Sequence, residues 1–210
     1  MEATVTRISD LGWVDQDVPD STPVPTVIRL PSDAADRSFS VIVRFPEGWT
    51  RPFTGYYEST EEIFLLEGRV AMSGATYSAG DYGWFPAGYL RTDSSSTGSL
   101  TLAFFSGPAR WRRLDRSPDG FDPSGVVVRR RGGGEAVESP LGPARCLRAG
   151  RRWSTFLFDG IETAVTPVGT RGELFAVDQG LWVSALPGST IPAIDGRVFC
   201  RLTGIDEPPD

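Results

Sequence analysis

The sequence predicts an all-β protein of the sandwich or barrel class. Segments of strand length recur along the 210 residues and are separated by turn residues. The 24 glycines and 17 prolines are spread along the chain, which suits many short strands joined by turns. The first half shows no sustained 3.6-residue apolar period of an amphipathic helix. Because 40% of the residues are hydrophobic, we expect a real core in one ordinary domain or two small ones.

Five stretches of the first half have strand character. They alternate or run apolar between turn residues, and they are TVIRL (26–30), FSVIVRF (39–45), EIFLLEGRVAM (62–72), YGWF (82–85) and SLTLAFF (99–105). Residues 62–72 read as two short strands about Gly68, and residues 46–52 (PEGWTRP) have the composition of a turn. This regular series of short strands is typical of a sandwich or barrel.

The second half reads as a weaker copy of the first. EIFLLE (62–67) resembles ELFAVD (173–178), WFPAG (84–88) resembles SALPG (184–188), and SLTLAFFSG (99–107) resembles GRVFCRLTG (196–204). We therefore predict a first barrel over 1–110, with its motif core over 20–107, a linker over 111–125, and a degenerate second barrel over 126–206. Trp111 and the arginines around it are expected on an exposed linker face. The triplet at 129–131 (RRR) fits a solvated loop better than a phosphate clamp.

Composition excludes several classes of function. The formal charge of −6 argues against a nucleic-acid partner. The longest apolar run, residues 100–105, is too short to span a bilayer, and the N-terminus lacks the pattern of a signal peptide. The two cysteines, Cys146 and Cys200, form no disulfide framework or metal knuckle and are expected to be core thiols. We expect a cytoplasmic protein with no membrane partner.

Missing residue types narrow the chemistry further. The chain has no His, and all 21 of its basic residues are Arg, since Lys is absent. Without Lys there is no Schiff base, and without His the commonest general base and transition-metal ligand are gone. The residue types that remain for chemistry are Asp, Glu, Tyr, Cys, Ser, Thr and Arg.

Two stretches carry motif spacing. In GYYESTEEIFLLEG (55–68) and GDYGWFPAGYLRTDSS (80–95), the chain resembles the two motifs of the cupin family, G-x5-H-x-H-x3-4-E-x6-G and G-x5-P-x-G-x2-H-x3-N. The matching residues are Gly68, Gly80, Pro86 and Gly88. Where the family has His, His, Glu, His and Asn, this chain has Gly55, Tyr57, Glu61, Arg91 and Ser95. The resemblance implies a double-stranded β-helix, the jelly-roll or cupin barrel, here as two tandem barrels. It also allows a homodimer.

The resemblance implies a metal held by three His and one Glu, and this chain departs from it. Gly55 has no side chain, Arg91 is a fixed cation, and Tyr57 binds a metal well only as phenolate. Glu61 alone cannot hold iron, manganese or zinc in that geometry. We therefore expect no metal and no cofactor, with the Arg91 guanidinium replacing the charge of the ion.

Strand alternation extends the candidate site. If Glu61 points inward as the motif implies, Ile63 and Leu65 share its side. Arg91 inward would likewise bring Tyr89 and Asp93 inward. Trp84 is a further candidate for substrate contact, although it fits the core equally well. Glu62 faces the other side and is expected on the outer surface.

Three functions remain open for this site. In the first, Arg91 binds a carboxylate, enolate or phosphate, Glu61 moves a proton, and Tyr57 donates a hydrogen bond or proton to a small organic substrate. This is enough for an isomerase, lyase or cyclase without a metal. In the second, Glu61 and Arg91 form a structural ion pair, and the barrel only binds or regulates. A metal-dependent dioxygenase is disfavoured, because its ligands are missing. An open mouth with Tyr57, Glu61 and Arg91 converging would indicate the enzyme.

Overall fold

A computed structural model describes residues 1–31, 38–150 and 152–203. The chain divides into two compact units, one of Gly12–Arg131 and one of Met1–Leu11 with Gly132–Asp210. Both are built from antiparallel strands, as the sequence predicts. The helices that the described ranges contain are the short 3-10 turns η1 (Ile8–Asp10) and η3 (Pro123–Gly125). Within these ranges no helix is long and apolar enough to cross a membrane.

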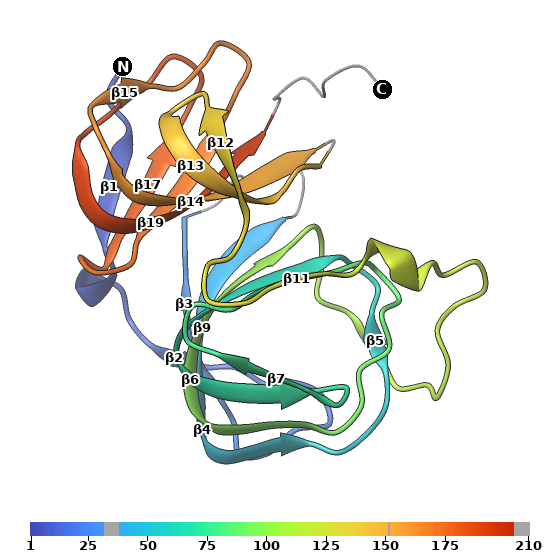
Figure 1. The fold of residues 1–210 in the computed structure, drawn as a ribbon. Coiled ribbons are helices and arrows are strands. Elements are labelled where there is room, and N and C mark those ends of the chain that lie inside the picture. Colours follow the sequence, from blue (N-terminus) through green and yellow to red (C-terminus); the bar gives the residue numbers. More distant parts are fainter. Residues whose placement is uncertain (32–37, 151, 204–210) are drawn as a thin grey trace. The chain divides into compact units, whose positions relative to one another are not determined.

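The first unit, Gly12–Arg131, is an eight-stranded antiparallel sheet that curves around its own interior (Figure 1). The strand order is β11-β8-β6-β9-β4-β3-β2, with β7 paired to β6. The bounds are β2 (Val14–Asp15), β3 (Thr26–Arg29), β4 (Phe39–Arg51), β6 (Glu61–Met72), β7 (Ala75–Ser78), β8 (Tyr82–Phe85), β9 (Ser94–Phe105) and β11 (Val127–Arg129). A separate pair joins β5 (Tyr56–Tyr57) to β10 (Trp111–Arg112).

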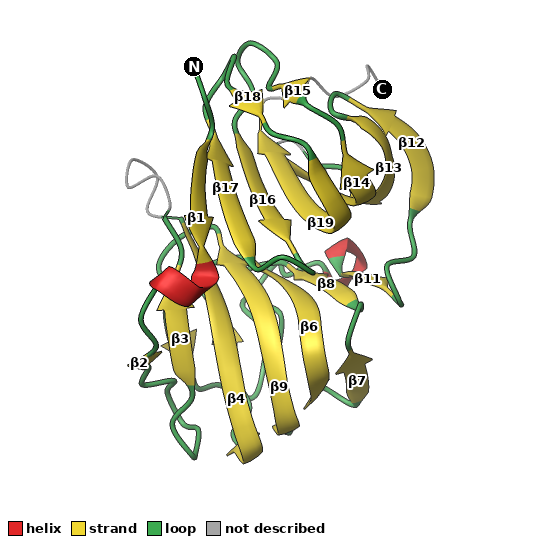
Figure 2. Cartoon of the chain, turned by 90° about the vertical axis from the view of Figure 1, so that its left-hand side faces the viewer, coloured by secondary structure: helices red, strands yellow, loops and turns green. Residues whose placement is uncertain are grey.

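Strands β4, β9 and β6 lie side by side and form the longest part of this sheet (Figure 2). These strands are longer than predicted, because glycines at the shifts in strand register let each chain segment continue as one strand. Of the predicted turn 46–52, residues 46–51 continue β4 instead of turning, since Gly48 takes a φ of 76° at a bulge in the pairing with β9. Gly68 has a φ of 71°, and a Cβ there would lie 1.9 Å from the Gly98 carbonyl oxygen. Only glycine therefore lets β6 pass this point as one strand.

The second unit repeats the strand order of the first. Its seven-stranded sheet runs β1-β17-β16-β19-β14-β13-β12, with a separate pair of β15 and β18. The bounds are β1 (Thr4–Arg7), β12 (Glu135–Ser139), β13 (Gly142–Arg148), β14 (Trp153–Ile161), β15 (Ala164–Val165), β16 (Gly172–Ala176), β17 (Leu181–Ala185), β18 (Thr190–Ile191) and β19 (Ile194–Thr203). Cys200 lies in its core, as expected, and burial raises the pKa of the thiol.

The predicted repeat coincides with the strand register. Glu62 in β6 lies opposite Trp84 in β8, and Glu173 in β16 lies opposite Ser184 in β17. In the same register Glu61 lies opposite Phe85, whereas Gly172 lies opposite Ala185. The second unit therefore has a glycine at the position where the first has the motif glutamate.

The unit boundaries differ from the predicted ones at both ends of the first barrel. Residues 1–11 belong to the second unit, because β1 pairs with β17. Residues 111–131, predicted mostly as linker, belong to the first unit, because β10 pairs with β5 and β11 pairs with β8. Residues 32–37 of the predicted motif core and 204–206 of the predicted second barrel lie outside the described residues.

The arginine triplet also belongs to the first unit, and two of its members hold the barrel closed. Arg130 donates a hydrogen bond from Nη1 to Asp81 Oδ2 over 2.9 Å, and the backbone N–H of Arg131 donates to Asp81 Oδ1 over 2.8 Å. Burial alone would raise the pKa of Asp81. The backbone N–H groups of Ser78 and Arg131 and the Arg130 guanidinium outweigh burial and hold that pKa below its ordinary value.

Candidate functional site

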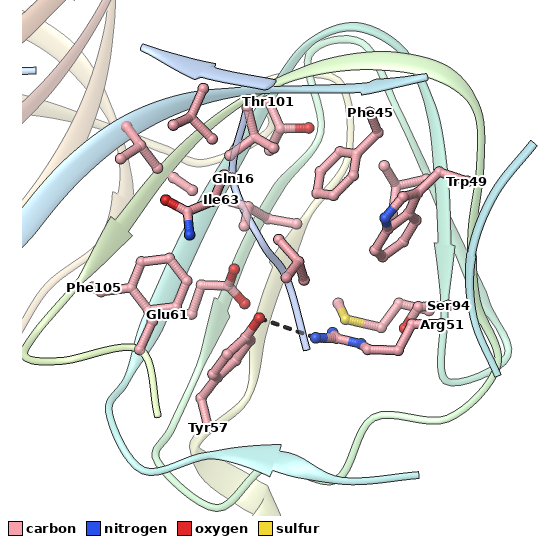
Figure 3. A pocket seen from close by; sticks show the side chains of 18 of the residues that line it. Gln16, Phe45, Trp49, Arg51, Tyr57, Glu61, Ile63, Ser94, Thr101 and Phe105 are labelled. Carbon is pink, nitrogen blue, oxygen red and sulfur yellow. Dashed lines mark hydrogen bonds between the residues drawn. The ribbon is translucent and has the colours of Figure 1, made fainter. Parts of the chain in front are cut away.

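The first unit encloses a cavity of about 330 Å³. Its floor is apolar and is formed by inward residues of the sheet, including Val27, Val41, Val43, Ile63, Leu65 and Ala103. Polar and charged side chains from β4, β5 and β6 converge above this floor (Figure 3). Arg91 joins the lining from the segment after β8. The volume lies at the lower end of the range of small-molecule sites.

Glu61 and Arg91 form an ion pair in the cavity wall, between Arg91 Nη1 and Glu61 Oε2. Glu61 opens β6, and alternation along that strand places Ile63 and Leu65 on the same lining, as predicted. Arg91 is positioned by two backbone hydrogen bonds with Gly55, whose N–H donates to the Arg91 carbonyl over 3.1 Å and whose carbonyl accepts over 2.7 Å. The two side chains are only 5% and 11% exposed, so the pair is shielded from water.

Gly55 is required by its surroundings. A Cβ at this position would lie 2.3 Å from the carbonyl oxygen of Arg112 and 2.5 Å from the Trp111 ring. The residue at the first histidine position of the motif thus allows β10 to pack closely against β5. It carries no ligand of its own.

Tyr57 points into the cavity and meets a residue that the sequence reasoning missed. Arg51 Nη1 donates a hydrogen bond to the Tyr57 hydroxyl over 3.0 Å (Figure 3). The Arg51 guanidinium lies 3.9 Å from the centre of the Trp111 ring, and Arg51 is 3% exposed. Alternation along β4 could have found it, because Val43, Phe45, Trp49 and Arg51 all line the cavity once the bulge at Gly48 is allowed for. Reading residues 46–52 as a turn hid this signal.

Trp111 packs against the site instead of standing on an exposed linker face. Its ring meets that of Tyr57 edge to face, with centroids 5.2 Å apart, and its Nε1 donates to Asp20 Oδ2 over 2.9 Å. The pairing of β10 with β5 puts it there. A segment that looks polar and irregular in the sequence therefore supplies one wall of the arginine site.

Three predicted substrate contacts do not line the cavity. Tyr89 stacks on Phe85, with ring centroids 5.0 Å apart, and packs against the core. Asp93 is exposed, because its left-handed backbone, with a φ of 47°, breaks the alternation expected after Arg91. Trp84 shares the face of Glu62, which is opposite to that of Glu61.

Glu62 does face away from the cavity, as alternation predicts, but it is not on the solvent-exposed surface. It is 3% exposed and accepts a hydrogen bond from the Tyr82 hydroxyl over 2.7 Å. It is therefore a buried, hydrogen-bonded carboxylate that takes no part in the cavity.

The cavity lining has an excess of positive charge in an otherwise acidic chain. Three guanidinium groups, from Arg29, Arg51 and Arg91, line it together with two carboxylates, from Asp17 and Glu61. Asp17 and Arg29 are both exposed, so water screens their charges, and the buried charges are those of Arg51, Arg91 and Glu61. Beside the cavity, burial, with a smaller effect of Tyr89, raises the pKa of Tyr77 to about 12, so this phenol is neutral near neutral pH.

The motif positions bring together one carboxylate, one phenol and one guanidinium. In the part of the chain that the structure describes, no group of three or more His, Cys, Asp or Glu residues could hold a metal ion. The arrangement can instead bind negative charge, hold a carboxylate in a fixed orientation, and donate hydrogen bonds from Tyr57.

Comparison with solved structures shows the fold. A candidate dioxygenase of Nostoc punctiforme superposes with a TM-score of 0.78 at 14% identity, over 100% of this chain and 88% of that one. Protein YlbA of Escherichia coli superposes with a TM-score of 0.65 at 12% identity, over 100% and 93% of the two chains. A candidate glyoxylate-induced protein of Pseudomonas aeruginosa gives 0.61 at 11% identity, over 94% and 86%. The shared fold is the cupin jelly-roll.

Comparison with sequences adds little. No protein-family model matches the chain. The phenylalanine–tRNA ligase alpha subunit of Streptomyces coelicolor is 30% identical over 149 residues, which are 70% of this chain and 38% of that subunit. Because the chain spans well under two thirds of the subunit, the activity of the whole ligase does not carry over.

Proposed function

We propose that this chain, which has the fold of the cupin superfamily, is a metal-independent enzyme acting on a small organic molecule. Its chemistry is proton transfer, as in an isomerase, lyase or cyclase. One observation carries the proposal: the buried pair of Glu61 and Arg91 forms a wall of a cavity of about 330 Å³ that leaves room for a ligand beside it. A pair that merely filled a vacant site would need no such space.

The donor set supports a reaction without a metal. Of the four motif positions, Gly55 has no side-chain atom that could bind a metal ion. Arg91 is a cation, which repels a metal ion. Glu61 is already paired with that cation. The Tyr57 oxygen accepts a hydrogen bond from a second cation, Arg51, so a metal would have to displace two guanidinium groups to reach two oxygens.

The Glu61–Arg91 pair suits proton abstraction next to a carbonyl group. A carboxylate oxygen of Glu61 would take the proton, and the C–H electron pair would move onto the substrate oxygen as an enolate. Glu61 becomes neutral as the enolate becomes negative, so Arg91 can pass its pairing from one anion to the other. Return of the proton at another position gives isomerisation, loss of a β-substituent gives elimination, and internal attack gives cyclisation.

Tyr57 supplies a hydrogen-bond donor for the same step. Its oxygen accepts from Arg51, and within the described ranges its own O–H has no acceptor. The O–H is therefore free to donate to an oxygen of the bound molecule. This gives Tyr57 the role predicted for it, with Arg51 fixing its position.

A non-catalytic, small-molecule-binding cupin is the second candidate, and the ion pair itself favours it. The sequence reasoning expected a locked Glu61–Arg91 pair without room in a binder or structural barrel, and an open convergence in an enzyme. The molecule combines features of both, because the pair is formed and the cavity persists. The distinction therefore depends on turnover.

Exchange of carbon-bound hydrogen in D2O tests the enzymatic proposal. We expect the wild-type protein to accelerate exchange at the enolisable carbon of at least one of 2-oxobutanoate, levulinate and phenylpyruvate, measured by proton NMR. Glu61→Gln should lower that rate by about 10²–10⁴-fold, because it removes the base. Glu67→Gln is the matched control, since Glu67 is an exposed glutamate on the same strand.

Two outcomes would overturn the proposal. The reaction would not be metal-independent if hydrogen exchange needed added metal. The same would follow if mass spectrometry found stoichiometric iron, manganese or zinc in the purified protein. Binding of these oxo acids without exchange above the blank would favour the binding cupin over the enzyme.

A further inference from the structure

Among the described residues, Arg51 is the buried cavity cation that no carboxylate neutralises. Arg91 is paired with Glu61, whereas the hydrogen-bond partner of Arg51 is the neutral Tyr57 hydroxyl. Among the described residues, Arg51 has no carboxylate within ion-pair distance, and its Nε has no hydrogen-bond partner. At 3% exposure, this charge is also largely removed from water.

Such a charge is costly unless something compensates it. Moving a guanidinium out of water carries a large desolvation penalty when no counter-ion is present. The rings of Trp111, Tyr57 and Trp49 lie 3.9, 5.3 and 5.9 Å from the guanidinium carbon, and cation–π contacts return part of that penalty. They hold the group in place without neutralising it, so a full counter-charge is still missing.

Other hydrogen-bond donors adjoin this charge. Ser94 lies opposite Arg51 in the pairing of β4 with β9, and its buried hydroxyl has no partner among the described residues. Adjacent residues of this kind share one face of the sheet, and Figure 3 shows both side chains at the same wall. The Tyr57 hydroxyl completes a set of three groups, all able to donate to one anion.

From these contacts we infer that Arg51, Ser94 and Tyr57 form a subsite for the carboxylate of a small monoanionic ligand. The ligand's apolar body would lie on the floor formed by residues such as Val41, Val43 and Leu65. A planar carboxylate matches the planar guanidinium, and its single charge matches the single excess charge. A phosphate ester would bring more negative charge than Arg51 balances. The inference rests on the proposed use of this cavity as a small-molecule site, and it names the class of molecule.

Matched pairs of acids and amides test this subsite. Hexanoate and hexanamide, benzoate and benzamide, and phenylacetate and phenylacetamide share their shapes and differ in charge. We expect at least one acid to bind the wild-type chain at least about 10-fold more tightly than its amide, by calorimetry or ligand-observed NMR. Arg51→Gln should remove this preference, and Arg51→Lys should keep part of it. Arg44→Gln on the same strand is the control, because Arg44 is exposed and stacks on Trp13.

The outcomes separate this inference from the proposed reaction. Equal binding of acid and amide in every pair, or a preference that survives in a folded Arg51→Gln variant, would overturn the subsite. A preference that depends on Arg51 without any hydrogen exchange in D2O would uphold the subsite and overturn the enzyme. If Arg51→Gln fails to fold, the preference is compared in Ser94→Ala, which should weaken acid binding and leave amide binding nearly unchanged.

Discussion

At the level of single residues, the charge of the site depends on how Glu61, Arg91 and Arg51 are paired. The sequence places Glu61 and Arg91 at motif positions, and the structure joins them in an ion pair. The role first expected of Arg91, binding a ligand carboxylate, then falls to Arg51, whose partners are a phenol and aromatic rings. One buried arginine of the cavity is therefore neutralised by a carboxylate and the other is not. Mutating each of them should have different effects.

Replacing each arginine by methionine should have different effects on stability. Arg91→Met leaves Glu61 as an unpaired buried charge, so we expect a loss of about 3–5 kcal/mol in the free energy of unfolding. Arg51→Met removes a charge that has no counter-ion, and relief of its desolvation offsets the lost cation–π contacts of about 2 kcal/mol. We expect little loss or a gain. Urea denaturation of both variants measures this, and an equal large loss would contradict it.

At the scale of elements, the barrel is completed by strands that the sequence reads as linker. Strand β11 pairs with β8, and the arginines after it bind Asp81 in the turn before β8. Strand β10 similarly brings Trp111 against Arg51. The segment 111–131 therefore serves the first unit both as a closing strand and as a packing surface for Arg51.

The contacts of Asp81 make this closure sensitive to acid. Because the folded-state pKa of Asp81 lies below its ordinary value of 3.8, its charge stabilises the fold above that value. The stabilisation is lost as the pH falls through the lower folded-state pKa. We expect Asp81→Asn to cost about 1–3 kcal/mol at pH 7, as a lost charged hydrogen-bond acceptor would.

Chemical denaturation of wild type and Asp81→Asn between pH 7 and pH 2 measures this dependence. The difference between the two proteins should shrink as the pH falls below about 4. A difference that stays constant with pH would show that the charge of Asp81 is not the cause. Asp119→Asn is the control, because Asp119 is an exposed aspartate of the same unit.

At the scale of the whole molecule, two units share a strand order and differ in their interiors. The bridge between Gly55 and Arg91 in the first unit corresponds to the pairing of Ala164 with Ile191 in the second. Gly172 stands in the register of Glu61. The second unit has thus filled these positions with apolar residues, and Ile191 is part of its core. We propose that it is a degenerate second barrel.

The loss of charge at the motif-equivalent positions of the second unit predicts one ligand per chain. Calorimetric titration with the acid that binds best should give a stoichiometry of about one, because Ala164, Gly172 and Ile191 cannot hold an anion or move a proton. Amide hydrogen exchange should show the added protection within residues 12–131. Two equivalent sites per chain would contradict this assignment.

The cupin resemblance implied that Glu61 points inward. The sequence pattern was enough for the fold class, the strands around the motifs and the common side of Glu61, Ile63 and Leu65. These are local properties, because alternation along a strand and the spacing of turn glycines depend only on neighbouring residues. It also located the internal repeat, whose segments fall in equivalent strand registers. Alternation did not predict the direction of the Asp93 side chain, because the left-handed backbone at Asp93 ends the strand pattern.

Which charges meet, and that Arg51 has no carboxylate counter-ion among the described residues, is set by contacts in the folded structure. Arg51 joins the site because Gly48 carries β4 past a predicted turn, and Trp111 joins it because β10 pairs with β5 across more than fifty residues. Whether Arg91 would face a ligand or Glu61 depended on distances between separate strands. Pairing between segments far apart in the chain is set by packing and hydrogen bonding in space, and a single sequence does not display it.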